Sequence, residues 1–309
     1  MIRLVAGIFL GWALGVNDTA KALGAAVSTQ MISYRDACLL SAGFIILGAI
    51  MDGNAGIRTL GSLTSQTNNS AFVACLAAAM TIGILTLLRL PVSASHAMVG
   101  GILGIGMFSG QINWGALEKV LICWILTPVG GALIASAAFI ILGRILRLIN
   151  LHFLKYDRLM RVSLFLVGCY SAFSMGANNA ANATGLFFKA GMLTLSQATL
   201  IGGLSIALGA LTFSRGVMQT LFSRILLMDA FSALIMLLSV ALTLHTFARI
   251  GVPVSISQAA IGAVLGIGMV KNFRLISLTT LFQIMMGWLF TPAMAFAFSF
   301  IMARWWLAV

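Results

Sequence analysis

Five runs in the chain, each between 18 and 29 residues long, contain no charged side chain. They are residues 71–88, 120–143, 162–188, 190–214 and 275–303. A helix of about 20 residues crosses a hydrocarbon core of about 30 Å, so each run can span a bilayer. The runs lack the alternation of apolar and polar residues that a membrane β-barrel requires. Helices therefore remain, because they satisfy their own backbone hydrogen bonds in lipid.

The composition indicates the same environment. Of the 309 residues, 61% are hydrophobic and 8% are charged, whereas charged residues make up about 25% of a soluble domain. We predict an all-α, polytopic protein of the cytoplasmic (inner) membrane, with the lipid bilayer as its principal partner.

The chain is basic, with 18 Lys and Arg against 6 Asp and Glu, but the charges are scattered singly between apolar runs. This dispersion excludes a nucleic-acid interface. One basic cluster stands out: Arg144, Arg147, Lys155, Arg158 and Arg161. Short loops rich in Lys and Arg stay on the cytoplasmic side, so we predict that residues 151–159 form a basic cytoplasmic loop.

No group of residues suits metal binding or catalysis. The four cysteines lie far apart in apolar stretches without a CxxC pair, which is typical of small buried residues. The sequence contains no dense cluster of His, Asp or Glu and no nucleotide-binding GxxxxGK[ST] motif. We therefore expect no enzyme activity, no cofactor and no metal site.

The chain repeats itself at a shift of about 161 residues. GVNDTAKA at 15–22 matches GANNAANA at 176–183, and PVSASH at 91–96 matches PVSISQ at 253–258. LGIGM recurs unchanged at 103–107 and 265–269, and the Trp-x-x-Thr-Pro pattern at 124–128 recurs at 288–292. The order of the blocks is conserved, so we divide the chain into a first repeat at 1–150, the basic loop at 151–159 and a second repeat at 160–309.

The repeated blocks are polar or glycine-rich, which helices facing lipid do not need. Polar groups at membrane depth normally face a cavity or a partner, and interrupted hydrophobic segments at matching places in two halves mark the substrate site of transporters. A simpler interpretation is helix packing, in which small residues let helices approach and Ser or Asn bonds between them. Packing is a stronger alternative for LGIGM than for the Asn-Asp and Pro-Val-Ser blocks.

The paired GxNDxAxA and PVSxSH motifs resemble those of the inorganic phosphate transporter family, over nearly the whole chain. The resemblance implies a symporter of two inverted-topology repeats whose interrupted helices meet near mid-membrane. It also implies phosphate as the substrate, or sulfate in some branches, driven by sodium or protons.

Physical chemistry independently assigns the motifs an anion site. Proline fits the first turn of a helix, so Pro91 and Pro253 are expected to begin short helices whose free N–H groups face an anion. Alternatively, Ser93 and Ser255 cap those helices. Serine hydroxyls and asparagine amides supply further donors. The predicted substrate-binding residues are Asn17, Asp18, Lys21, Ser93, Ser95, Asn178, Asn179, Asn182, Ser255 and Ser257.

His96 has Gln258 as its counterpart in the second half. A shared hydrogen-bonding role accounts for both residues, whereas a proton relay accounts for the histidine alone. His152 and His245 are interpreted as interfacial, and Asp52 and Asp229 as interfacial or helix-terminal charges.

Two departures from the family pattern concern the coupling ion. The second motif has Asn179 where the family has Asp, and Lys21 stands where the second half has Asn182. The lysine ammonium either pairs with Asp18 three residues earlier, or replaces a sodium ion or contacts the anion itself. The loss of one carboxylate and the gain of one ammonium predict sodium-independent transport, driven by protons or by the anion gradient.

We thus expect a secondary active transporter for an inorganic oxyanion that works by alternating access. Phosphate leads on resemblance. The alternative is a sodium-independent, proton-coupled sulfate permease, because fully ionised sulfate is repelled by carboxylates and Asn179 removes one. A passive anion channel is a more remote alternative. Inverted repeats need an odd number of spans each, so both termini should lie outside; a homodimer is also considered.

Overall fold

The computed structural model describes residues 2–88, 92–212, 229–271 and 278–307, and these form eleven α-helices and no β-strand. Seven helices in this part are long and apolar enough to cross a membrane. They are α2 (Tyr34–Asp52), α4 (Asn68–Leu87), α6 (Trp114–Ile149), α7 (Phe153–Lys189), α8 (Leu195–Thr212), α10 (Ala230–Ile250) and α12 (Leu278–Trp306). The other four helices of the described residues are α1 (Leu4–Ser28), α3 (Asn54–Gly61), α5 (Ala94–Ser109) and α11 (Ile256–Lys271). The predicted all-α membrane architecture is confirmed.

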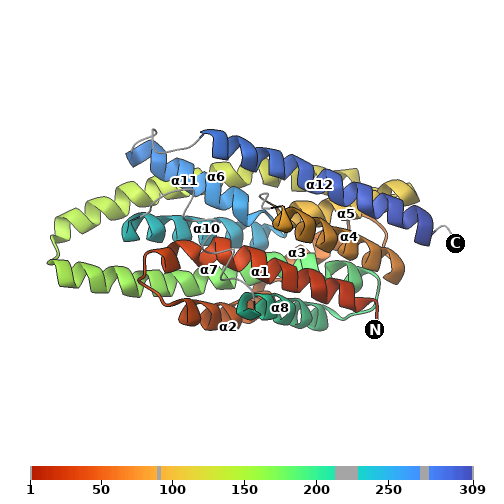
Figure 1. The fold of residues 1–309 in the computed structure, drawn as a ribbon, viewed down its shortest axis with the longest axis horizontal. Coiled ribbons are helices and arrows are strands. Elements are labelled where there is room, and N and C mark those ends of the chain that lie inside the picture. Colours follow the sequence, from red (N-terminus) through yellow and green to blue (C-terminus); the bar gives the residue numbers. More distant parts are fainter. Residues whose placement is uncertain (1, 89–91, 213–228, 272–277, 308–309) are drawn as a thin grey trace.

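The helices form an elongated bundle, with most of them running along its long axis (Figure 1). The hairpin of α6 and α7 projects at one end, and the start of α1 and the end of α12 lie at the opposite end. The link between α6 and α7 is shorter than predicted. Only residues 150–152 connect the two helices, so the basic loop expected at 151–159 is mostly helical. Asn150 ends α6 in the left-handed conformation, with φ of 44°, which Asn tolerates better than most residues.

The helices of the two halves pack reciprocally. The first-half helices α1 and α2 lie against the second-half helices α8 and α7, and α5 and α6 lie against α12 and α11. Glycines make the α1–α8 crossing possible: a Cβ on Gly15 would lie 2.0 Å from the Ile206 carbonyl oxygen, and one on Gly209 would lie 2.1 Å from the Trp12 oxygen. Close packing of this kind holds membrane helices together, because in lipid the hydrophobic effect does not drive helices to associate.

Pro128 and Pro292, together with the LGIGM glycines, lie where α6 crosses α11 and where α12 crosses α5. A Cβ on Gly100 would lie 2.3 Å from the Pro292 oxygen of α12, and one on Gly262 would lie 2.1 Å from the Pro128 oxygen of α6. Within LGIGM, Gly104 approaches the Phe296 oxygen in the same way, at 2.6 Å. The structure therefore supports the packing interpretation for these blocks.

Candidate functional site

Interrupted helices bring the Asn-rich and Pro-Val-Ser blocks together. Residues 15–22 lie in α1 and residues 176–183 in α7, while α5 and α11 begin directly after the two Pro-Val-Ser segments. Five of the six charged or amide side chains predicted to bind the substrate are at most 4% exposed: Asn17, Asp18, Asn178, Asn179 and Asn182. Asn182 is fully buried.

Asn178 holds the second Pro-Val-Ser segment by its main chain. Its Nδ2 donates to the Val254 oxygen at 2.9 Å, and its Oδ1 accepts from the Val254 nitrogen at 2.9 Å. The side-chain amide thus pairs with a backbone peptide group as a neighbouring β-strand would. Because both polar ends of Asn178 are engaged in this way, its first task is to position the segment before α11.

Asn179 and Asn182 connect the same helix to the first half. Asn179 Nδ2 donates to Asp18 Oδ2 at 3.0 Å, and Asn182 Nδ2 donates to Ser95 Oγ at 3.2 Å and to Asn179 Oδ1 at 3.0 Å. Ser95 in turn donates to the Val254 oxygen at 3.1 Å. One buried hydrogen-bonded ring therefore joins α1, α5, α7 and the segment before α11.

The serines, rather than the prolines, begin the short helices. Ser93 is the N-cap of α5 and accepts from the His96 nitrogen at 3.5 Å. Ser255 precedes α11 and accepts from the Gln258 nitrogen at 3.4 Å. Pro253 lies three residues before Ile256, the first residue of α11, so placing it in the first turn was wrong. Each serine hydroxyl accepts a hydrogen bond from a free N–H in the first turn of its helix, which a proline side chain cannot do. Pro91 falls outside the described residues.

The hydroxyls of Ser255 and Ser257 lie 2.8 Å apart, where either one can donate to the other. One of the two hydrogens is therefore always free for another acceptor. Asn17 Nδ2 and Asn182 Oδ1 are buried without a hydrogen-bond partner among the described residues. Lys21 belongs to α1, but its side chain lies outside the described part of the chain, so its predicted roles stay predictions.

His96 fills a gap in the hydrogen bonding of α12. Pro292 lacks an N–H, so the Trp288 carbonyl four residues earlier has no helical donor; His96 Nδ1 lies 3.1 Å from that oxygen. A carbonyl can only accept, which places a hydrogen on Nδ1. Within the described residues His96 Nε2 and Gln258 Oε1 have no partner. This geometry favours a hydrogen-bonding role, and the proton-relay alternative stays open.

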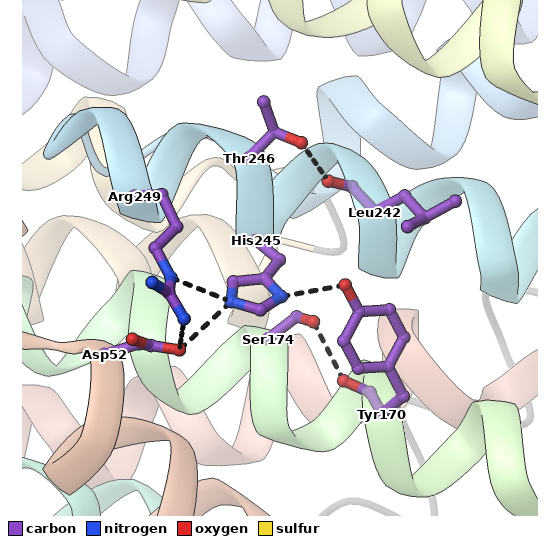
Figure 2. A network of polar contacts seen from close by, with 7 residues as sticks. All are labelled: Asp52, Tyr170, Ser174, Leu242, His245, Thr246 and Arg249. Atoms are coloured by element: carbon purple, nitrogen blue, oxygen red, sulfur yellow. Dashed lines mark hydrogen bonds and ion pairs between the residues drawn. The ribbon is translucent and has the colours of Figure 1, made fainter.

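Sequence reasoning missed a second polar network, on α10 (Figure 2). His245 lies 3.0 Å from Asp52 Oδ2 through Nε2 and 2.8 Å from the Tyr170 hydroxyl through Nδ1. Arg249 contacts the same Asp52 oxygen at 3.1 Å. Asp52 and His245 are separated by 193 residues, so no local spacing could have linked them.

The comparisons with known proteins identify the family. Residues 14–299 match the phosphate transporter family. The chain belongs to this family. It is a membrane transporter and not an enzyme.

Relatives of this transporter extend over its whole length. A protein of Methanocaldococcus jannaschii, inferred to be a phosphate permease, is 29% identical over 98% of this chain and 96% of its own. The sulfate permease of Bacillus subtilis is 27% identical over 98% of this chain and 86% of its own. A solved sodium-dependent phosphate transporter has the same fold, with a TM-score of 0.86, 23% identity, and coverage of 99% of this chain and 98% of the other.

Proposed function

We propose that this transporter carries an inorganic oxyanion by alternating access, as a symporter that does not use sodium. The observation that carries the proposal is the buried ring of Asp18, Asn179, Asn178, Ser95 and Asn182, which draws on both halves of the chain. Polar groups of this density are expensive inside a membrane and accumulate where a substrate passes. Alternating access fits the ring, because relative motion of the two halves would expose it first to one side and then to the other.

The proposed site consists of the ten predicted residues, of which Asn178 acts by positioning the segment that carries Ser255. Helix α11 directs its free N–H groups at the Pro-Val-Ser segment, and Ser255 and Ser257 add a hydroxyl donor beside them. Donors of this kind suit a tetrahedral anion. Replacing Ser255 by Ala should cost about 1–3 kcal/mol of anion affinity. Binding of both phosphate and sulfate at the parental affinity by that variant would place the site elsewhere.

Phosphate is the first candidate substrate on family grounds, and sulfate is supported by a specific contact. Asn179 donates to Asp18 Oδ2, so it supplies an N–H where a carboxylate would supply an acceptor. Hydrogenphosphate carries a proton that needs an acceptor, whereas sulfate carries none. Mutual competition between labelled phosphate and labelled sulfate distinguishes the two; phosphate uptake that excess sulfate does not reduce would support phosphate alone.

The proposed independence from sodium rests on the same bond. A sodium ion at this point would need oxygen ligands, but an amide N–H, which cannot coordinate a cation, contacts Asp18 from the second half. We propose protons or the anion gradient as the driving force. Lys21→Ala should abolish uptake, and Lys21→Asn combined with Asn179→Asp should restore sodium stimulation. Strong sodium stimulation of the unmodified protein would contradict the proposal.

We further propose two inverted repeats in the cytoplasmic membrane, with the α6–α7 link inside and both termini outside. The reciprocal packing of equivalent helices and the location of the chain ends opposite the basic hairpin (Figure 1) support this topology. Single cysteines placed at the termini and at Tyr156, labelled from either side, test it; a cytoplasmic N-terminus would refute it.

The experiment that tests transport itself uses purified protein in proteoliposomes. Uptake of labelled phosphate and of labelled sulfate is followed with a sodium gradient, with a proton gradient and with neither. Accumulation above the external concentration, driven by protons, is the expected result. Equilibration without accumulation under every gradient would instead indicate a passive anion channel. Measuring the mass of the detergent-solubilised protein tests the homodimer.

A further inference from the structure

A half-buried cluster at the end of α10 combines a carboxylate, an imidazole, a phenol and a guanidinium. Asp52 is the last residue of α2, Tyr170 comes from α7, and His245 and Arg249 lie one turn apart on α10 (Figure 2). The side chains of Asp52 and His245 are 13% and 21% exposed, whereas that of Arg249 is 67% exposed. Arg249 thus lies at the protein surface, while the imidazole and carboxylate are largely enclosed.

The contacts of His245 with Asp52 and Tyr170 suit either protonation state of the ring, whereas the Arg249 Nε–H, 3.4 Å from Nε2, has no acceptor there when Nε2 carries a hydrogen. In the neutral ring, Nε2–H donates to Asp52 Oδ2 and the Tyr170 hydroxyl donates to Nδ1. When a proton is added at Nδ1, the imidazolium donates from both nitrogens and the Tyr170 oxygen changes from donor to acceptor. The phenol hydrogen turns away from the ring, and no heavy-atom contact is lost. Because the bonds to Asp52 and Tyr170 persist in both states, the ring can gain and release a proton with little rearrangement.

The charged and titratable groups around the ring are few. Asp52 faces it from α2 and Tyr170 from α7, and Arg249 on α10 itself has its Nε 3.4 Å from Nε2. From α6, Lys119 donates to the Ile250 oxygen, just over one turn further along α10. The recorded contacts of α3 with this end of α10 are made by Ala55 and Thr59, which are uncharged.

The cluster shares two chain segments with the ring of asparagines. Tyr170 precedes Asn178 by eight residues of the continuous helix α7, a rise of about 12 Å. Arg249 is followed by Ile250 and then by the segment containing Val254, which Asn178 holds. Tyr170 lies on the α6–α7 side of Asn178. The cluster therefore lies between the proposed anion site and the end of the bundle where the α6–α7 hairpin projects.

We propose that His245, paired with Asp52, is the proton-binding site that couples anion movement to the proton gradient. This inference rests on the proposed oxyanion transport. With neutral His245 the charges of Asp52 and Arg249 cancel, and a bound proton leaves the cluster with one positive charge. For a separation equal to the rise of about 12 Å between Tyr170 and Asn178, and an effective dielectric constant of about 20, each negative charge of a bound anion raises the proton affinity about tenfold. By reciprocity, a protonated His245 raises the anion affinity by the same factor.

Proteoliposomes containing His245→Gln test the coupling. Two rates are measured with whichever of sulfate or phosphate the parent protein carries: accumulation driven by an acidic exterior, and exchange with the same anion inside and no gradient. Glutamine can still bond to Asp52 but cannot be protonated. Accumulation should fall at least about tenfold, while exchange should stay within about twofold of the parental rate. His152→Gln, which alters an exposed histidine at the start of α7, is the matched control and should change neither rate.

A second variant guards against misfolding. Tyr170→Phe keeps the contacts of Asp52 but removes the partner of Nδ1, so it should shift the pH dependence of accumulation without abolishing exchange. Parental accumulation by His245→Gln would overturn the proposal, and so would equal losses of accumulation and exchange in both variants. Parental exchange with accumulation driven only by sodium would overturn the proton site but not oxyanion transport. Absence of exchange in the parent would overturn the proposed function and this inference together.

Discussion

Asn178→Ala is expected to release the segment before α11. In the described part of the structure, the Val254 N–H has Asn178 Oδ1 as its recorded acceptor, whereas the Val254 oxygen also accepts from Ser95. Removing the amide therefore leaves one buried donor unpaired, because the second acceptor bond can persist. An unpaired buried donor costs about 1–3 kcal/mol, which corresponds to an opening equilibrium that is about 5- to 150-fold larger.

Hydrogen exchange measured by mass spectrometry, with the protein in lipid nanodiscs, reports this opening directly. Pro253 carries no amide hydrogen, so the signal of a peptide covering residues 252–256 contains that of Val254 with few others. We expect this peptide to exchange about 5- to 150-fold faster in Asn178→Ala. Anion affinity should fall as well, because the same segment carries Ser255 and Ser257.

The matched control for this prediction is Ser174→Ala. Ser174 is fully buried one turn earlier on α7, and its hydroxyl donates within the same helix to the Tyr170 oxygen at 2.9 Å. Losing such a bond should leave exchange at 252–256 unchanged. Unchanged exchange in Asn178→Ala would refute the positioning role of Asn178. Equally accelerated exchange in the control would show that any cavity on α7 loosens the segment.

Three further predictions concern packing, hydrogen bonding and pH. Gly15→Ala should lower the melting temperature through a clash costing about 1–3 kcal/mol, whereas Gly43→Ala, with nothing within 4 Å, should not. His96→Gln should retain uptake and His96→Leu should lose stability, by about 1–3 kcal/mol for an unpaired carbonyl; loss of uptake in His96→Gln would favour the proton relay. Burial raises the pKa of Asp229, but hydrogen bonds from Lys271 and Ser232 outweigh it and lower that pKa overall. The resulting stability is present above the ordinary carboxyl pKa of about 3.9 and is lost as the pH falls through the lowered value. Asp229→Asn should therefore reduce the fall in melting temperature at acidic pH. The same fall in both proteins would contradict this.

Local sequence was sufficient for the membrane fold, because the information that sets a spanning helix lies within the helix. The described residues of each of the five uncharged runs lie in one of the long helices, except Leu88 after α4 and residues 190–194 before α8. Helices α2 and α10 lie outside these runs, and both end close to a charged residue of the second polar network. The family resemblance also followed from sequence alone and is confirmed, whereas the inverted repeat stays a prediction. The individual site residues stay predictions.

Only the tertiary structure decided which hydrogen-bond partners the side chains of the polar blocks have. Asparagine at a membrane site can donate to an anion or bind a peptide group, and only the approach of Val254 from 76 residues away shows that Asn178 does the latter. The same holds for His245, whose interfacial appearance in sequence conceals contacts to Asp52 and Tyr170 from two other helices. Hydropathy is a property of one segment, whereas hydrogen-bond partners depend on how several segments pack. The sequence by itself determined which segments enter the lipid, and packing determined what their polar side chains bind.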